Sequence, residues 1–217
     1  MNLAPAPTPT PDTPEEERIR SAFVRGDLEG AATALLQIYG SEIFGFLLVR
    51  LRDPELASEA FADFTEDLWR GLGAFRWVCS ARAWAYTLAR HAASRIIRQR
   101  RRRGARVVPL SNAGPLSELA ERVRSETAVA LQTTTRNRIV ELREQLPIGD
   151  QMLLMLRVNR GLPWLDIARI MASSSVDAAI ELPTETLTTE ASRLRKRFQK
   201  AKEKLRRLAT EAGLLTD

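Results

Sequence analysis

The chain of 217 residues contains one cysteine, Cys79, and one histidine, His91. A single cysteine excludes an internal disulfide, and the two residues together cannot supply the ligands of a structural zinc site. Long apolar runs are also missing, because the longest is the seven-residue stretch 43–49, far short of a membrane span. No basic segment followed by an apolar stretch, the mark of a secretory signal, is present near residue 1. We therefore expect a cytoplasmic protein without membrane insertion, and we expect no metal or other cofactor.

Proline and glycine are unevenly placed and divide the chain. Five of the eleven prolines lie within residues 1–14, which are expected to form a disordered tail. A second cluster, over 104–116, marks a domain boundary and begins a linker assigned to 104–135. Strand-like alternation is absent elsewhere. The sequence therefore predicts an all-α fold of two small helical domains, at 15–103 and 136–217, joined by that linker.

Local start signals give the expected helix boundaries. Three glutamates at 15–17 open a first helix, and Asp53 precedes a proline at a first helical position. Ser80 and Thr184 are candidate N-caps of two further helices. The later helices are expected at 27–52, 54–72, 80–103, 117–145, 148–160, 163–172 and 184–212.

Charge is divided between the two halves of the chain. The formal net charge is +6, but residues 1–97 carry 10 basic and 13 acidic side chains, whereas residues 98–217 carry 23 and 14. An acidic half beside a basic half indicates two different kinds of partner, and nucleic acid is the first candidate for the basic half.

An acidic helix is expected over 54–72. Six acidic residues and no basic residue lie between Arg52 and Arg70: Asp53, Glu55, Glu59, Asp63, Glu66 and Asp67. Apolar residues at helical spacing occupy the opposite side. The acidic side is either a solvated face or a docking face for a basic partner. A site for a hard cation is a third interpretation that no other feature supports.

An aromatic and basic helix is expected over 80–103. Trp84 and Tyr86 lie close in sequence to Arg82 and Arg90, a combination suited to unpaired nucleic acid because bases stack on rings while guanidinium groups hold phosphates. The structural alternative places Trp84 in the core and makes the arginine run at 100–103 a solvated tail. His91 has no carboxylate or nucleophile at an informative spacing, so a catalytic role is not indicated.

The C-terminal segment is basic and amphipathic. Residues 193–207 hold nine basic side chains and one acid, with an apolar stripe at intervals of three and four. The short helix expected at 163–172 precedes it, and this order is typical of a helix-turn-helix domain whose second helix enters the major groove. A membrane surface or an acidic protein is an alternative partner for such a helix.

In this order the segments resemble the extracytoplasmic-function (ECF) group of bacterial sigma-70-type sigma factors, over about residues 30–103 and 136–210. Residues 57–69, ASEAFADFTEDLW, are similar to the family's acidic polymerase-docking segment, and residues 82–90 to the segment that melts the −10 element. His91 and Arg95 stand where Asn and Asp are usual. Residues 154–170 and 193–205 are similar to the two helices of region 4, with about 16 additional residues near 172–189.

The resemblance implies a sigma factor that binds the RNA polymerase core and directs initiation at promoter DNA, with an anti-sigma factor or another regulator as a further partner. The implied polymerase-binding residues are Glu59, Asp63, Phe64, Asp67 and Trp69. The implied −10 contacts are Arg82, Trp84, Tyr86, Arg90, His91 and Arg98. The implied −35 contacts are Ser192, Arg193, Arg195, Lys196, Arg197 and Lys200.

The residues also allow two other classes of function to be compared. A helix-turn-helix regulator that acts without polymerase would use only the C-terminal segments and would leave the acidic helix without a role. An enzyme such as a nuclease is not expected, because no residue set supplies paired catalytic carboxylates, a nucleophile with its base, or a phosphate-binding glycine loop.

Overall fold

The computed structural model describes residues 13–103, 116–133, 138–172 and 182–215, and every regular element in these ranges is a helix. The prediction of an all-α fold is confirmed. The elements are α1 Pro14–Val24, α2 Leu28–Leu51, α3 Pro54–Leu72, α4 Ala81–Arg103, α5 Ser117–Thr133, α6 Arg138–Glu144, α7 Ile148–Leu154, the π-helix η1 Met155–Asn159, α8 Trp164–Ala172 and α10 Thr184–Glu211.

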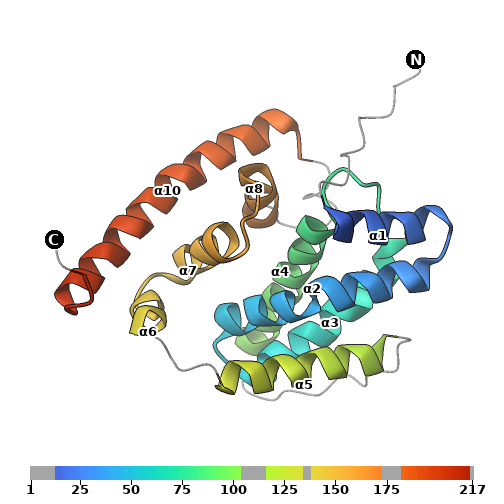
Figure 1. Ribbon diagram of the computed structural model, residues 1–217, viewed down its shortest axis with the longest axis horizontal. Helices are drawn as coiled ribbons and strands as arrows, with labels where there is room; N and C mark the ends of the chain where they lie inside the picture. The colour runs from blue at the N-terminus through green and yellow to red at the C-terminus, as the bar shows by residue number, and fades with distance from the viewer. Residues whose placement is uncertain (1–12, 104–115, 134–137, 173–181, 216–217) are drawn as a thin grey trace.

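Helix α2 is the centre of the first half of the molecule, and α1, α3, α4 and α5 all pack against it (Figure 1). Among the described helices, α2 alone is long and apolar enough to cross a membrane by length and composition. Two thirds of its most apolar window is buried inside the protein, which is the pattern of a core helix. Its buried side chains include Leu35, Ile43, Phe46 and Leu47.

Two of the helix N-caps expected from the sequence, Asp53 for α3 and Ser80 for α4, are present in the structure. Asp53 accepts hydrogen bonds from the amides of Glu55 and Leu56 at 3.0 and 3.1 Å, and Ser80 accepts one from Ala83 at 3.1 Å. The cap assigned to Thr184 is wrong. The carbonyl of Pro183 already accepts the first helical hydrogen bond, from Leu187 at 3.1 Å, so Pro183 holds the N-cap position and Thr184 lies inside α10.

Two described helices overlap segments that the sequence assigned to the tail and to the linker. Pro14, placed in the tail by sequence, is the first residue of α1, and Thr13 caps that helix. The rest of the tail lies outside the described residues. Helix α5 lies within the segment assigned to the linker and packs on α2 and α3. The expected helix at 117–145 is described as α5 and α6, which are separated by residues outside the described ranges.

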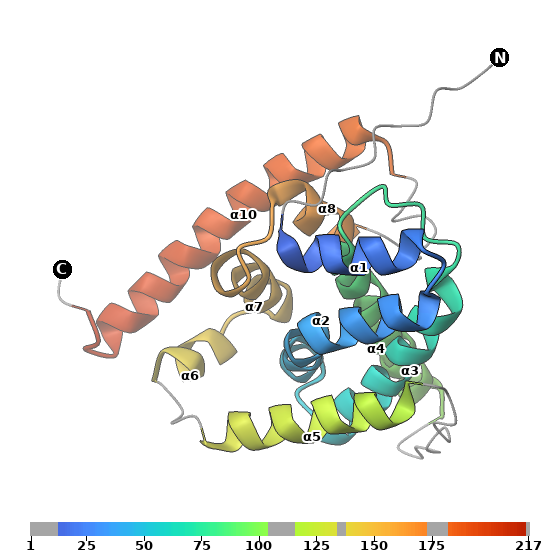
Figure 2. The ribbon, with the colours of Figure 1, turned by 45° about the vertical axis from the view of Figure 1, so that its right-hand side comes forward.

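The second half of the molecule consists of α6, α7, η1, α8 and α10, with α10 lying along α6, α7 and α8 (Figures 1 and 2). The expected helix at 148–160 ends as the π-helix η1, and Gly161, at φ +66°, turns the chain toward α8. The predicted insertion near 172–189 lies partly outside the described residues, and its last residues form the first turns of α10.

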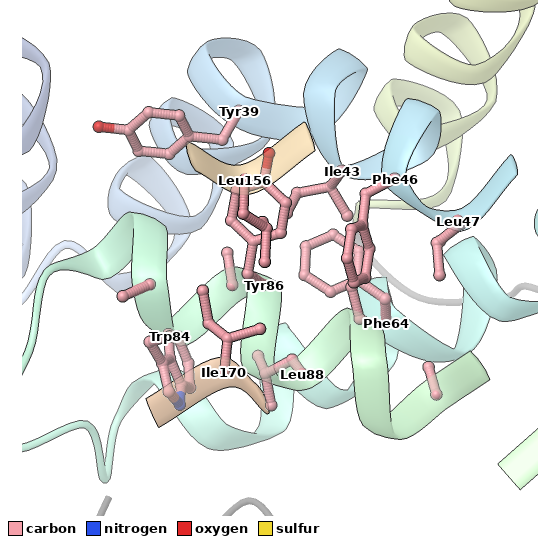
Figure 3. Packing of buried hydrophobic residues seen from close by; sticks show 14 of the residues in the cluster. Tyr39, Ile43, Phe46, Leu47, Phe64, Trp84, Tyr86, Leu88, Leu156 and Ile170 are labelled. Carbon is pink, nitrogen blue, oxygen red and sulfur yellow. The ribbon is translucent and has the colours of Figure 1, made fainter. Parts of the chain in front are cut away.

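The two halves share one hydrophobic core. Helix α8 packs on α4 and α7 packs on α2. Leu156 and Ile170, both 0% exposed, lie among Trp84, Tyr86 and Leu88 of the first half (Figure 3). The contact between the halves therefore buries apolar surface from both of them. Such burial is stabilising by about 25 cal/mol for each square ångström of apolar surface removed from water.

Candidate functional site

The acidic face of α3 is held in place by its apolar opposite side. Phe61, Phe64 and Leu68 are 0–1% exposed and pack toward α2 and α4. Phe64, predicted to bind polymerase, is therefore a core residue here. Trp69, at 36% exposed, lies at the surface of the same helix. The helix thus presents one large ring and a series of carboxylates to the outside.

Arg95 of α4 reaches across to the acidic face of α3. Its Nη2 lies 2.6 Å from Oδ2 of Asp67 and 3.4 Å from Oδ2 of Asp63. The pKa of Asp63 is nonetheless raised, because burial outweighs the attraction of Arg95. Burial and the nearby Asp63 also raise the pKa of Glu59. Part of the predicted docking charge is therefore already neutralised inside the protein.

Helix α4 is anchored at its N-terminus by a carboxylate from α1. Glu16, only 5% exposed, accepts hydrogen bonds from the amides of Ala81 and Arg82 at 2.8 and 2.9 Å. The Tyr39 hydroxyl donates to the same carboxylate at 3.1 Å. Free amides and the positive end of the helix dipole favour an anion at this position. Glu16 therefore acts as a cap supplied from 65 residues away in sequence.

Arg82 is engaged within the protein. Its Nε and Nη2 donate to the two carboxylate oxygens of Glu42, on α2, at 2.7 and 2.8 Å. This two-point geometry is the strong form of an arginine–carboxylate pair. Arg160, which follows η1, approaches the same carboxylate at 3.8 Å. Glu42 therefore links α2, α4 and the second half of the molecule.

The aromatic residues predicted to bind −10 bases lie in the core. Trp84 is 2% exposed and stacks on Phe75, with ring centroids 4.5 Å apart and planes 16° apart. Tyr86 is 0% exposed and meets Phe46 edge to face at 5.2 Å (Figure 3). In this arrangement both rings stack on protein, so they hold α4 against its neighbours rather than facing solvent.

His91 is buried among arginines on α4. It is 7% exposed, and burial, followed by the charges of Arg90, Arg95 and Arg98, lowers its pKa from 6.5 to about 4. Its imidazole is therefore neutral at pH 7. Burial also lowers the pKa of Arg90, whereas Arg98 is exposed near the C-terminal end of the helix.

The basic face of α10 is outward and its apolar stripe is inward. Leu187, Ala191, Leu194, Phe198 and Ala201 are buried, and Trp164 of α8 meets Phe198 edge to face at 5.4 Å. The predicted −35 residues are all exposed: Ser192, Arg193, Arg195, Lys196, Arg197 and Lys200. The structure therefore collects this set on one accessible helix.

Arg195 and Arg197 have partners on other helices that orient them, whereas Ser192 and Arg193 donate hydrogen bonds to Thr188 and Glu190 of α10 itself. The Arg195 guanidinium lies over the Trp164 ring at 5.6 Å, which is cation–π geometry. Arg197 donates to Asp150 of α7 at 2.6 Å. A Cβ at Gly149 would collide with the Arg197 guanidinium, so glycine permits this close approach.

Sequence reasoning missed Glu16 and Glu42. Both carboxylates are buried, at 5% and 8% exposed. A signal for Glu16 was present, because it lies three residues before the buried Ile19 and hence on the apolar side of α1. No group of three or more histidine, cysteine or acidic residues that could hold a metal ion occurs in the described residues.

Comparison with known protein families finds a match within the first half of the molecule. Residues 35–103, from α2 to the end of α4, match the family model of sigma-70 region 2. The match, which covers less than half of the chain, supports a relation to the sigma-70 family of sigma factors, which bind RNA polymerase and take part in promoter recognition. No curated protein and no solved structure gives a significant match.

Proposed function

We propose that the chain is an ECF-type sigma factor that joins core RNA polymerase through α3 and contacts promoter DNA through α4 and α10. The observation that carries this proposal is the separation of the two charged faces. Helix α3 packs on α2, α4 and α5, whereas α10 packs on α6, α7 and α8 (Figure 2). The ion pairs of α3 run to Arg95 and Arg100 of α4 or stay within α3, and those of α10 run to Asp150 of α7 or stay within α10. Among the described residues the two faces are therefore not paired with each other, and each can meet a separate partner.

The polymerase contact is assigned to the outer side of α3. Glu59 is partly exposed and Trp69 is 36% exposed, and Asp63 and Asp67 lie between them along the helix. A basic polymerase surface would compete with Arg95 for the two aspartates. Electrostatic complementarity of this kind steers association and fixes the orientation of the complex.

The −35 contact is assigned to the exposed basic residues of α10. Ser192, Arg193 and Lys196 lie on the first half of α10. In a helix-turn-helix domain, the N-terminal residues of the second helix are the ones that contact base edges in the major groove. Lysine and arginine bind phosphates, and arginine also recognises guanine by two hydrogen bonds. Trp164 supports this role by holding Arg195 in a defined position.

The −10 contact is assigned to the C-terminal half of α4. Arg98, Arg101 and Arg102 are exposed, whereas Trp84 and Tyr86 are buried. The exposed arginines would hold the phosphates of the promoter DNA, and the buried rings would fix α4 in place through Phe75 and through Phe46 of α2. Capture of unpaired bases by Trp84 or Tyr86 would require local rearrangement of the core.

The test combines binding and transcription. Full-length chain would be mixed with core RNA polymerase and a promoter library, and the transcription starts would be mapped. Promoter-specific initiation supports the proposal, and its absence with every promoter tested contradicts it.

The Glu59→Lys variant separates this function from that of a regulator that acts without polymerase. We expect it to weaken polymerase binding about tenfold or more while leaving DNA binding by α10 intact. Glu126→Lys on α5, another exposed acid, is the matched control. Equal polymerase binding by both variants would favour the regulator.

A further inference from the structure

Two cavities lie side by side where the halves of the molecule meet. One, of about 660 Å³, lies between α2 on one side and α6, α7 and η1 on the other. The second, of about 610 Å³, adjoins it between the end of α2 and the start of α7. Arg52 and Glu144 line both. Each volume falls within the range of roughly 300–1,000 Å³ that is usual for small-molecule sites.

The walls of these junction cavities are strongly basic. Their charged lining residues are Arg50, Arg52, Arg143, Arg160, Lys204 and Glu144. Five cations therefore face one carboxylate. Such an excess of one charge around a recess raises the local concentration of ligands of the opposite charge.

The arginines at the junction have mainly neutral partners. Arg50 donates to the Met152 sulfur at 3.3 Å and to the Ser94 hydroxyl at 3.4 Å. Arg143 donates to the Asn159 side chain at 3.0 Å. The Nε of each arginine is buried without an acceptor among the described residues. Burial also lowers the pKa of both guanidinium groups.

The two remaining arginines have spare donors. Arg52 uses one guanidinium nitrogen, on the carbonyl of Glu144 at 3.1 Å. Arg160 lies 3.8 Å from a carboxylate of Glu42 that Arg82 already holds at two points. A guanidinium group has five N–H donors, and buried charges normally have an ionic partner. The junction therefore lacks negative charge.

We propose that the junction binds a small anion carrying two or more linked phosphate groups. Arg52 lines both cavities, so an anion with two linked groups can reach cations in both, whereas a single phosphate would engage only one. Planar guanidinium groups match phosphate oxygens in pairs. Because the cations belong to both halves of the molecule, the bound anion would stabilise the contact between them.

Calorimetric titration of the full chain with inorganic pyrophosphate tests the site. We expect saturable binding that weakens about tenfold in Arg52→Gln and in Arg143→Gln, the loss expected from one charge-assisted hydrogen bond. Arg70→Gln, which removes a charge that is 73% exposed on α3, is the control and should bind as the unchanged chain does. No binding, or equal weakening in all three variants, would overturn the proposal.

Thermal unfolding gives a second readout that does not depend on the variants. Pyrophosphate should raise the unfolding midpoint of the full chain progressively as its concentration exceeds the dissociation constant, because it binds the folded form, in which the two halves meet, and not the unfolded chain. A midpoint that stays constant at saturating pyrophosphate would overturn the proposal.

Two further arms identify the source of the phosphates. ATP in place of pyrophosphate shows whether a nucleotide or a free phosphate anion binds more tightly, and either order supports the site. Duplex DNA is the competing occupant, so loss of DNA binding in Arg143→Gln with pyrophosphate binding unchanged would overturn the proposal. These titrations use the chain without polymerase, so their failure leaves the tests of the proposed function unaffected.

Discussion

The Arg95 guanidinium lies 2.6 Å from the Asp67 carboxylate, so α4 is tied to the acidic face of α3. The same nitrogen is 3.4 Å from Asp63. An arginine at position 95 departs from the family pattern described above, and the structure explains it locally. It offsets the repulsion between two aspartates that lie one helical turn apart.

Arg95→Gln should lower the free energy of unfolding by about 1 kcal/mol at low salt, because Asp63 and Asp67 lose their shared cation while partly buried. Urea unfolding measures this change. Arg70→Gln is the control, since Arg70 pairs with Glu66 at the surface and its substitution should change stability little. Equal changes in the free energy of unfolding for the two substitutions would show that the ion pairs between α3 and α4 stabilise the fold no more than a surface pair does.

Glu16→Ala should lower the free energy of unfolding by about 2–3 kcal/mol. It removes the acceptor of two amide donors at the start of α4 and of the Tyr39 hydroxyl. Chemical denaturation followed by circular dichroism is the measurement. Glu15→Ala, an exposed neighbour on the same helix, should change stability by less than about 0.5 kcal/mol. Similar losses in both variants would contradict the assigned cap.

The pH dependence of stability should include a contribution from His91. Its pKa is lowered from 6.5 to about 4, so between these values the unfolded chain binds a proton that the folded chain does not. The free energy of unfolding therefore falls as pH drops from 6.5 toward 4, by about 3 kcal/mol from this group, and levels off below.

Comparison with His91→Asn isolates this contribution from the carboxylates. Glu59 and Asp63, whose raised pKa values act in the opposite direction, titrate in both proteins and cancel in the difference. Unfolding curves at several pH values between 7 and 4 would be compared. A difference between the two proteins that does not vary with pH would disprove the assignment.

Trp84→Ala should mainly reduce the stability of the fold, whereas Trp69→Ala should mainly weaken polymerase binding. Trp84 is 2% exposed, so its removal leaves a cavity and should lower the free energy of unfolding by about 3–5 kcal/mol. Trp69 is 36% exposed, so its removal should cost less than about 1 kcal/mol and should instead weaken polymerase binding. Thermal unfolding and a polymerase binding assay on both variants check this. A stable Trp84→Ala protein with a specific defect in promoter opening would show that this ring acts on DNA.

The exposed lysine on α10 gives a test based on salt. If Lys196 contacts a phosphate, Lys196→Gln should reduce the slope of log affinity against log salt by about 0.9 with duplex DNA. Fluorescence anisotropy at several salt concentrations measures the slope. Arg70→Gln, on α3, should leave the slope as it is. A slope unchanged by Lys196→Gln would remove this side chain from the DNA-binding face.

Some expectations from sequence were wrong or incomplete for identifiable reasons. Thr184 has the composition of a cap, but the preceding proline already accepts the first helical hydrogen bond. The glycines and prolines that precede α5 make the sequence around it look like a linker. Ala120 of α5 and Leu116, which precedes the helix, are buried, and glycine at position 40 of α2 leaves room for the Val123 side chain.

The sequence alone determined the all-helical class, most helix boundaries and the order of acidic and basic segments, because caps and apolar periodicity act within a few residues. Only the tertiary structure decided that Trp84 and Tyr86 face the core, that Glu16 caps α4, and that five cations meet at the junction of the halves. These features join residues far apart in the chain. Local periodicity shows which side of a helix is buried, but the long-range packing decides which partner covers it.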